Sequence, residues 1–293
     1  MDFIISFIEQ GLIYGVLALG VYITYKILDF PDLSVDGSFP LGASVTATLI
    51  VRGVNPYLTL LIAFAVGVAA GICTGLIHVK CQVRDLLAGI IMMTALWTIN
   101  LRIAGTANVP MLSQQTIFKN DMLNSIIPSG ISGYVKILMI VILALVCKLL
   151  MDGYLKTKSG YLLRAVGDND ILVTSLAKDQ GNVKILGLAI ANGLVALAGS
   201  MFCQYQRVFD ISMGTGAVVI GLASVIIGTS ILKKLTFFKP TTAVLLGAVI
   251  YMACVAMALK KCTPQDTKLI TAILLLAVLV ISHGRRKKVK TNA

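Results

Sequence analysis

The chain is dominated by apolar runs about 20 residues long, separated by shorter polar stretches. A run of that length covers the hydrocarbon core of a bilayer when it forms an α-helix. Hydrophobic residues make up 57% of the 293 residues and charged residues only 13%, whereas a soluble domain carries roughly 25% charged residues. A transmembrane β-barrel has short alternating segments instead. The sequence therefore predicts an all-α, polytopic membrane protein.

About nine segments (eight to ten) meet the length criterion for a spanning helix. The first has neither a basic leading region nor a small-residue cleavage site, so we expect a retained span and not a signal peptide. The nine segments are 3–27, 37–51, 57–79, 84–105, 132–151, 183–206, 214–232, 240–259 and 267–283.

The basic residues predict how the chain is oriented. Cytoplasmic loops of membrane proteins collect Lys and Arg, and the long polar stretch 152–183 is rich in both. If this stretch is cytoplasmic, counting spans outward places the basic tail 284–293 inside and the N-terminus outside. Most of the 25 Lys and Arg residues then lie inside, although Lys260, Lys261 and Lys268 fit poorly. The net charge of +12 has this explanation, and no groove-reading motif indicates nucleic-acid binding.

Two distant segments of the sequence resemble each other. GVLALGVYITYKILDFPDLSV, starting at Gly15, aligns without a gap to GLVALAGSMFCQYQRVFDISM, starting at Gly193. Asp32 then matches Asp210, and each aspartate stands two residues before a serine. Five predicted spans separate the two copies, so they would cross the membrane in opposite directions. The pattern predicts two inverted-topology repeats with discontinuous helices, as in many transporters.

The segment DFPDLSVDGSFP, from Asp29 to Pro40, puts acids, hydroxyls and helix breakers between apolar runs. Polar backbone survives at membrane depth only inside protein or beside a water-filled cavity. Broken segments at matching positions of two repeats point to a substrate pathway. The alternative is an ordinary polar loop at the membrane surface, in which Asp and Ser cap helix ends. The sequence leaves both interpretations open.

The stretch 152–183 has short amphipathic patterns. GYLLRAVG, from Gly160 to Gly167, puts Leu162, Leu163 and Val166 on one helical face. Asp168 or Asn169 can then cap a second short helix, which carries Leu172 and Leu176 among its apolar residues. Such helices either dock into a groove on a partner or lie along the membrane surface.

The sequence lacks the motifs of an enzyme. It has only two histidines, His78 and His283, and neither HExxH nor GxSxG occurs. The six cysteines form no CxxC pair, so no metal site is expected. The phosphate-binding motif GxxxxGK[ST] is also missing, so we expect no catalysis and no cofactor in this chain.

Several of these stretches carry a family likeness. SGYLLRAVGDND and the span that follows it resemble the coupling loop and next span of permease subunits in bacterial ABC importers, of the branched-chain amino acid and simple-sugar class. DLSVDGSFPLGA, TINLRIAGTANVPML and DISMGTGAVVIGLASVIIG are similar to a branch linked to amino-acid uptake, aromatic amino acids included. Thr229 and Ser230 depart from that branch, where an acidic residue is expected after Gly228.

The resemblance implies a single transmembrane permease domain over 1–293 in a multi-pass, bacterial cytoplasmic-membrane protein. Repeat 1 covers about 3–105, a linking helix 132–151, a cytoplasmic coupling loop 152–183 and repeat 2 about 184–283. The implied partners are a second copy in a homodimer, the lipid bilayer, an external substrate-binding protein and an ATPase that holds ATP and Mg. An ion- or proton-coupled secondary transporter that uses Asp32 and Asp210 is the alternative.

The site residues that follow from the repeat and the resemblance form two sets. The translocation pathway would include Asp32, Ser34, Asp36, Gly37, Asp210, Ser212, Gly214 and Gly216. The ATPase-coupling surface would include Gly160, Leu162, Leu163, Arg164, Val166, Gly167, Asn169, Leu172 and Leu176.

Overall fold

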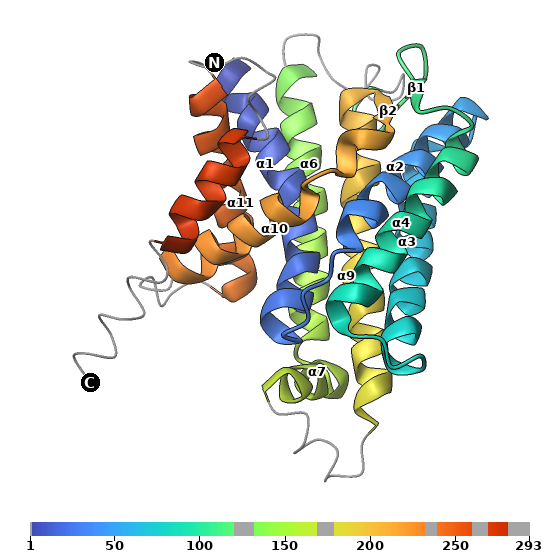
Figure 1. Cartoon of the computed structure of the whole chain (residues 1–293). Coiled ribbons are helices and arrows are strands. Elements are labelled where there is room, and N and C mark those ends of the chain that lie inside the picture. Colours follow the sequence, from blue (N-terminus) through green and yellow to red (C-terminus); the bar gives the residue numbers. More distant parts are fainter. Residues whose placement is uncertain (1, 120–131, 169–178, 232–238, 260–268, 281–293) are drawn as a thin grey trace.

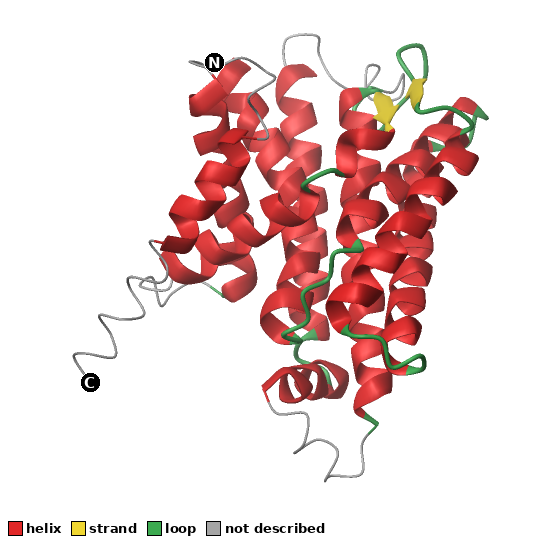
Figure 2. Cartoon of the chain, in the orientation of Figure 1, coloured by secondary structure: helices red, strands yellow, loops and turns green. Residues whose placement is uncertain are grey.

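The computed structural model describes residues 2–119, 132–168, 179–231, 239–259 and 269–280. Nearly all of these residues are helical (Figure 2). The helices are α1 (Asp2–Val21), the π-helical turn η1 (Tyr22–Ile27), α2 (Val35–Val51), α3 (Pro56–Val79), α4 (Asp85–Ala104), α6 (Ser132–Tyr154), α7 (Lys158–Asp168), α9 (Gln180–Gln206), the 3-10 turn η2 (Ile211–Gly214), α10 (Ala217–Ile226), the π-helical turn η3 (Ile227–Ile231), α11 (Pro240–Leu259) and a last helix, Leu269–Val280.

Every predicted apolar segment coincides with a helix, which confirms the all-α membrane protein. Six helices of the described residues are long and apolar enough to cross a bilayer: Ile4–Ile27, Pro56–Val79, Asp85–Ala104, Gln180–Gln206, Ile211–Ser230 and Pro240–Leu259. Val35–Val51 and Leu269–Val280 are apolar but shorter. The predicted number of nine crossings is therefore not confirmed.

Helix α9 lies at the centre of the bundle and packs against α1, α2 and α3. Glycine permits the close approach to α2. A Cβ atom on Gly42 would collide with the carbonyl oxygen of Ala196, and one on Gly199 would collide with that of Phe39. Small residues bring helix backbones together in this way inside membranes, where lipid tails remove most of the hydrophobic drive for association.

An aromatic cluster joins the same helices. The ring of Phe39 on α2 lies 5.9 Å from Tyr14 on α1 and 5.7 Å from Phe202 on α9. The rings of Tyr14 and Phe202 are 5.2 Å apart. These centroid distances are those of favourable aromatic pairs, so the cluster stabilises the arrangement of three helices from different parts of the chain.

Two helical segments begin near the middle of the molecule instead of at its ends. The chain leaves η1 at the lower end, rises as a loop without regular structure, and starts α2 about halfway up the molecule (Figures 1 and 2). After α9 reaches the upper end, the chain turns back through η2 and starts α10 near the middle (Figure 1). Helices α1 and α9, which precede these segments, run in opposite directions (Figure 1).

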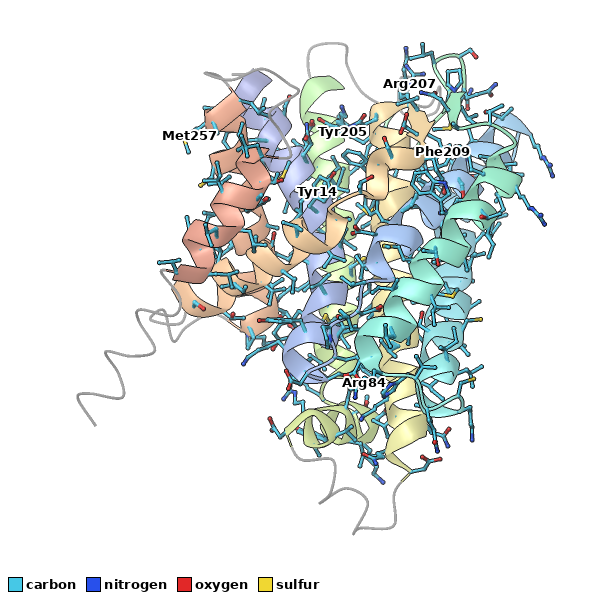
Figure 3. All side chains as sticks on the ribbon, viewed as in Figure 1. Tyr14, Arg84, Tyr205, Arg207, Phe209 and Met257 are labelled. Atoms are coloured by element: carbon cyan, nitrogen blue, oxygen red, sulfur yellow. The ribbon has the colours of Figure 1, made fainter. Side chains whose placement is uncertain are left out.

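A short two-stranded sheet closes the upper end. Strand β1 (Asn108–Pro110) pairs antiparallel with β2 (Val208–Asp210). The two ends of the molecule carry different residues: Arg84 lies at the end occupied by α7, while Tyr205 and Arg207 lie at the opposite end with the sheet (Figure 3). The part of the predicted polar stretch 152–183 that forms α7 thus lies at the opposite end of the bundle from the sheet (Figure 1).

Candidate translocation pathway and coupling surface

The irregular segment before α2 is held by the carboxylate of Asp32, which is 5% exposed. One carboxylate oxygen, Oδ1, accepts a hydrogen bond of 2.8 Å from the backbone N–H of Ser34, at the start of α2. The other, Oδ2, accepts one of 2.9 Å from the side-chain amide of Asn192 on α9. Asp32 therefore orders the turn that leads into α2 and also fixes this turn to the central helix.

Asn192 is the centre of a buried polar cluster, which we call the Asn192 cluster and define as Asp32, Ser34, Ser38 and Asn192. The hydroxyls of Ser34 and Ser38 donate to Oδ1 of Asn192 over 3.1 and 2.6 Å. Three of its members have no exposed surface, Asp32 being the fourth. Buried polar groups at membrane depth need hydrogen-bond partners inside the protein, and here the members of the cluster are partners of one another.

The sequence prediction included Asp32 and Ser34 but missed Asn192. A signal existed, because Asn192 is a single amide within the apolar run LGLAIANGLVALAG. Polar residues inside spanning helices rarely face lipid. Asn100 on α4 is a second missed amide of the same kind, and its Nδ2 donates to the backbone oxygen of Gly37 over 3.1 Å.

The two segments that start in mid-molecule meet at Asp36. Its carboxylate accepts hydrogen bonds from the backbone N–H groups of Gly216 (3.0 Å) and Val218 (2.8 Å), at the start of α10. Gly214 packs so closely that a Cβ atom there would collide with the carbonyl oxygen of Asp36 and the ring of Pro40. The structure thus brings Asp36 of the predicted pathway set together with Gly214 and Gly216, whereas Gly37 faces α4, where a Cβ atom on it would meet Leu96.

Asp210 and Ser212 lie elsewhere, at the upper end. Asp210 pairs with Asn108 across the two strands, and its carboxylate accepts a hydrogen bond of 2.7 Å from the N–H of Ser212 and another from the Ser212 hydroxyl. Asp210 caps the turn η2, and Asp32 accepts the same kind of hydrogen bond, from the N–H two residues on, in the turn before α2. The two matching aspartates share this local role but have separate partners, so they do not form one joint site.

The predicted coupling surface begins with α7, which lies across the lower end of the bundle (Figure 1). Leu163 and Val166 are buried, as the amphipathic pattern predicted. They face the chain itself, however: a Cβ atom on Gly187 of α9 would meet Leu163 and Leu28, and one on Gly167 would collide with the carbonyl oxygen of Ile27. The apolar face of α7 therefore packs on η1 and α9 and is not free for a partner.

The opposite face of α7 is exposed and polar. Tyr161 is 61% exposed, and Arg164 and Asp168 are exposed as well. Gly160 is buried and Leu162 partly buried. The remaining predicted coupling residues, Asn169, Leu172 and Leu176, lie outside the described residues, as does the basic tail 284–293.

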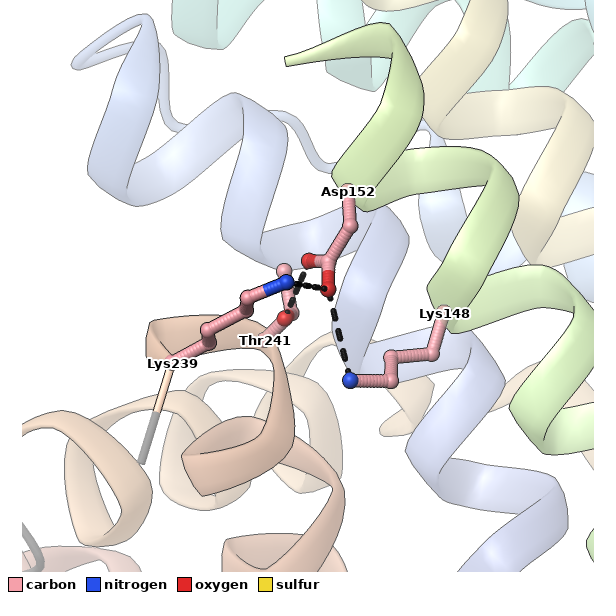
Figure 4. A network of polar contacts seen from close by, with 4 residues as sticks. All are labelled: Lys148, Asp152, Lys239 and Thr241. Atoms are coloured by element: carbon pink, nitrogen blue, oxygen red, sulfur yellow. Dashed lines mark hydrogen bonds and ion pairs between the residues drawn. The ribbon is translucent and has the colours of Figure 1, made fainter. Parts of the chain in front are cut away.

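A polar network that the sequence did not predict ties α6 to the start of α11 (Figure 4). The carboxylate of Asp152, near the end of α6, accepts a hydrogen bond of 2.5 Å from the hydroxyl of Thr241. It also lies 3.3 Å from the ammonium groups of Lys148 and Lys239. The side chain of Asp152 is only 10% exposed, so both cations compensate a largely buried charge.

Comparison with known proteins agrees with this architecture. The family described as branched-chain amino acid transport system, permease component, matches residues 3–280. The chain belongs to this permease family. The description of this family as a permease component fits the apolar helices, so the chain is an integral, multi-pass membrane protein and a transport component.

Three relatives are similar to this chain in sequence. A tyrosine transport system permease protein of Clostridioides difficile is 44% identical over 100% of this chain and 96% of its own length. An uncharacterised protein of Rickettsia prowazekii is 32% identical over 94% and 96%. A probable branched-chain amino acid transport permease of Methanocaldococcus jannaschii is 27% identical over 73% and 70%. No solved structure matches.

Proposed function

We propose that this permease is the membrane-spanning subunit of an ABC importer that carries an amino acid, and specifically an aromatic one such as tyrosine, into the cell. The observation that carries this proposal is the 44% identity, along the whole chain, to a relative named as a tyrosine transport permease. Solute would pass near the junction of α2 and α10, where two helices start inside the bundle beside polar side chains.

The fold supports the inverted repeat as part of this proposal. A spanning helix, a returning polar segment and a helix that starts in mid-molecule occur twice, once as α1 to α2 and once as α9 to α10, with the two leading helices in opposite directions (Figure 1). In transporters of this type one repeat rocks against the other around a fixed site. We expect the same motion here, in a homodimer of the chain.

Helix α7 is the expected site of coupling to a separate ATPase. Its buried face is packed on η1 and α9, so a force applied to α7 would reach two spanning helices. The contact with the ATPase would then use the exposed face of Tyr161, Arg164 and Asp168, which recurs at helical spacing. This assigns the end with α7 to the cytoplasm and the end with β1 and β2 to the outside, where a substrate-binding protein would deliver solute. ATP and Mg would belong to the ATPase.

The test is uptake of radiolabelled tyrosine by cells that lack this chain, with and without its re-expression. We expect re-expression to restore uptake, unlabelled phenylalanine to compete better than unlabelled leucine, and depletion of ATP at constant proton gradient to stop uptake. A protonophore at constant ATP should have little effect. Uptake that follows the proton gradient instead of ATP would favour the ion-coupled transporter and overturn the ABC assignment.

A companion experiment tests the assigned partner surface. Purification of the chain from its own membranes should recover an ATPase with a phosphate-binding motif. Tyr161→Ala should weaken that recovery, since an aromatic side chain supplies much of the contact area at an interface. Lys80→Ala is the matched control, because Lys80 is another exposed residue outside α7 and no contact of it enters the proposal. Equal loss in both variants would contradict the assignment of the α7 surface.

A further inference from the structure

The N-terminal end of α10 has no cap of its own. Gly216, the residue before the helix, has a left-handed backbone with φ of +88° and offers no side chain. The first N–H groups of any helix lack partners within the helix. At the start of α10, Gly216 and Val218 donate theirs to the two carboxylate oxygens of Asp36, one each.

This cap comes from a different part of the chain. Asp36 lies in the first turn of α2, 180 residues before Gly216. A carboxylate at a helix N-terminus also interacts favourably with the positive end of the helix dipole, and the effect grows where water is excluded. The close packing of Gly214 against the backbone of Asp36 and the ring of Pro40 leaves little room for α10 to shift while the cap is made.

The other aspartates of the predicted pathway set do not have this property. The carboxylate of Asp210 accepts hydrogen bonds from Ser212 in its own turn, and the carboxylate of Asp32 binds Ser34 just before its own helix and Asn192 of α9. Asp36 alone among these three joins α2 to α10. Its position in the sequence does not have a matching aspartate in the second copy, because Gly214 stands at the offset of 178 residues.

We propose that Asp36 is a positioning residue for transport: its carboxylate fixes the N-terminal end of α10 to the first turn of α2, so that the two segments starting in mid-molecule are displaced together. This deepens the proposed function and rests on it, since the joint displacement matters only if the chain transports solute.

The test uses Asp36→Asn, which keeps the size of the side chain, removes its charge and leaves one acceptor oxygen for two donors. The reporter is Ala217→Cys, because Ala217 is only 2% exposed beside the cap. Reaction with N-ethylmaleimide is followed at residue 217 by peptide mass spectrometry, since Cys73 and Cys81 are also exposed. The matched control is Asp85→Asn, an acid in the first turn of α4.

We expect Asp36→Asn to raise the labelling rate at residue 217 by at least about tenfold. This is the change in an opening equilibrium that corresponds to the loss of one hydrogen bond to a charged group. Asp85→Asn should change it by less than about twofold. In uptake assays Asp36→Asn should lower the maximal rate. The half-saturating concentration should stay unchanged, because only a structural change at the initial binding step would alter it. A labelling rate equal to that of the control would overturn the proposal.

A second measurement covers the case in which Asp36→Asn does not accumulate. In the wild-type protein, the amides of Gly216 and Val218 should exchange with deuterium far more slowly than those of an unstructured peptide. Exchange at the unstructured rate would also overturn the proposal. If the cap is confirmed but the wild-type chain carries no amino acid, the proposed function fails separately from the assignment of Asp36 as the residue that joins α2 to α10.

Discussion

Replacing Asn192 with leucine tests how much the Asn192 cluster stabilises the fold. Leucine has the branched shape of asparagine, so the change removes the hydrogen bonds of the amide, but leucine is also larger and adds some crowding at this buried position. Three of these bonds reach α2 or the segment before it: the amide donates to Asp32, and the hydroxyls of Ser34 and Ser38 donate to its oxygen. A fourth, from the amide to the Leu188 carbonyl, stays within α9.

The magnitude follows from these contacts. The bond to the Asp32 carboxylate contributes about 1.5–3 kcal/mol, as for charged partners in general. The two bonds from serine contribute about 0.6 kcal/mol each, the average for side-chain bonds between membrane helices. The loss of these bonds alone should therefore lower the free energy of unfolding of Asn192→Leu by about 3–4 kcal/mol. At about 2–4 °C per kcal/mol, the midpoint of thermal unfolding should fall by roughly 6–16 °C.

The assay is thermal unfolding of the purified protein in detergent, followed by loss of the monodisperse peak on size-exclusion chromatography. Thr74→Val is the matched control: Thr74 is also fully buried, but its hydroxyl donates only to the carbonyl of Ala70 within the same helix. This control should shift the midpoint by less than about 3 °C, the effect of about 1 kcal/mol. Equal shifts in the two variants would refute the claim that the Asn192 cluster holds α2 against α9.

Two further predictions concern the end of the molecule with α7. Asp152→Asn should destabilise the protein by about 1 kcal/mol and make its stability less dependent on salt, since both ion pairs are lost and Lys239 is more than half exposed. Unfolding midpoints in low and high salt measure this effect, and an unchanged salt dependence would contradict the prediction. Leu163→Asp should detach α7 from η1 and α9, because Leu163 is fully buried between them; limited proteolysis within 152–168 should accelerate, whereas Tyr161→Asp, on the exposed face of the same helix, should leave the cleavage rate unchanged.

The sequence determined much of the fold by itself. Runs of about 20 apolar residues fixed the all-helical membrane architecture, because only a helix satisfies every backbone group of such a run in lipid. The two Asp-x-Ser sequences stand in the turns that precede α2 and α10, and helical spacing placed Leu163 and Val166 on one buried face. These features depend on residues close together in the chain.

Only the tertiary structure decided which distant groups meet. The pattern of α7 showed an apolar face but not its partner, which is the chain's own η1 and α9. Asp32 and Asp210 match in sequence, yet it is Asp36 that joins α2 to α10, and Asn192 rather than Asp210 that binds Asp32. The physical reason is that a side chain's partner across a membrane bundle depends on the rotation and depth of each helix. Those are set by close contacts such as Gly42 against Ala196, between segments more than 150 residues apart.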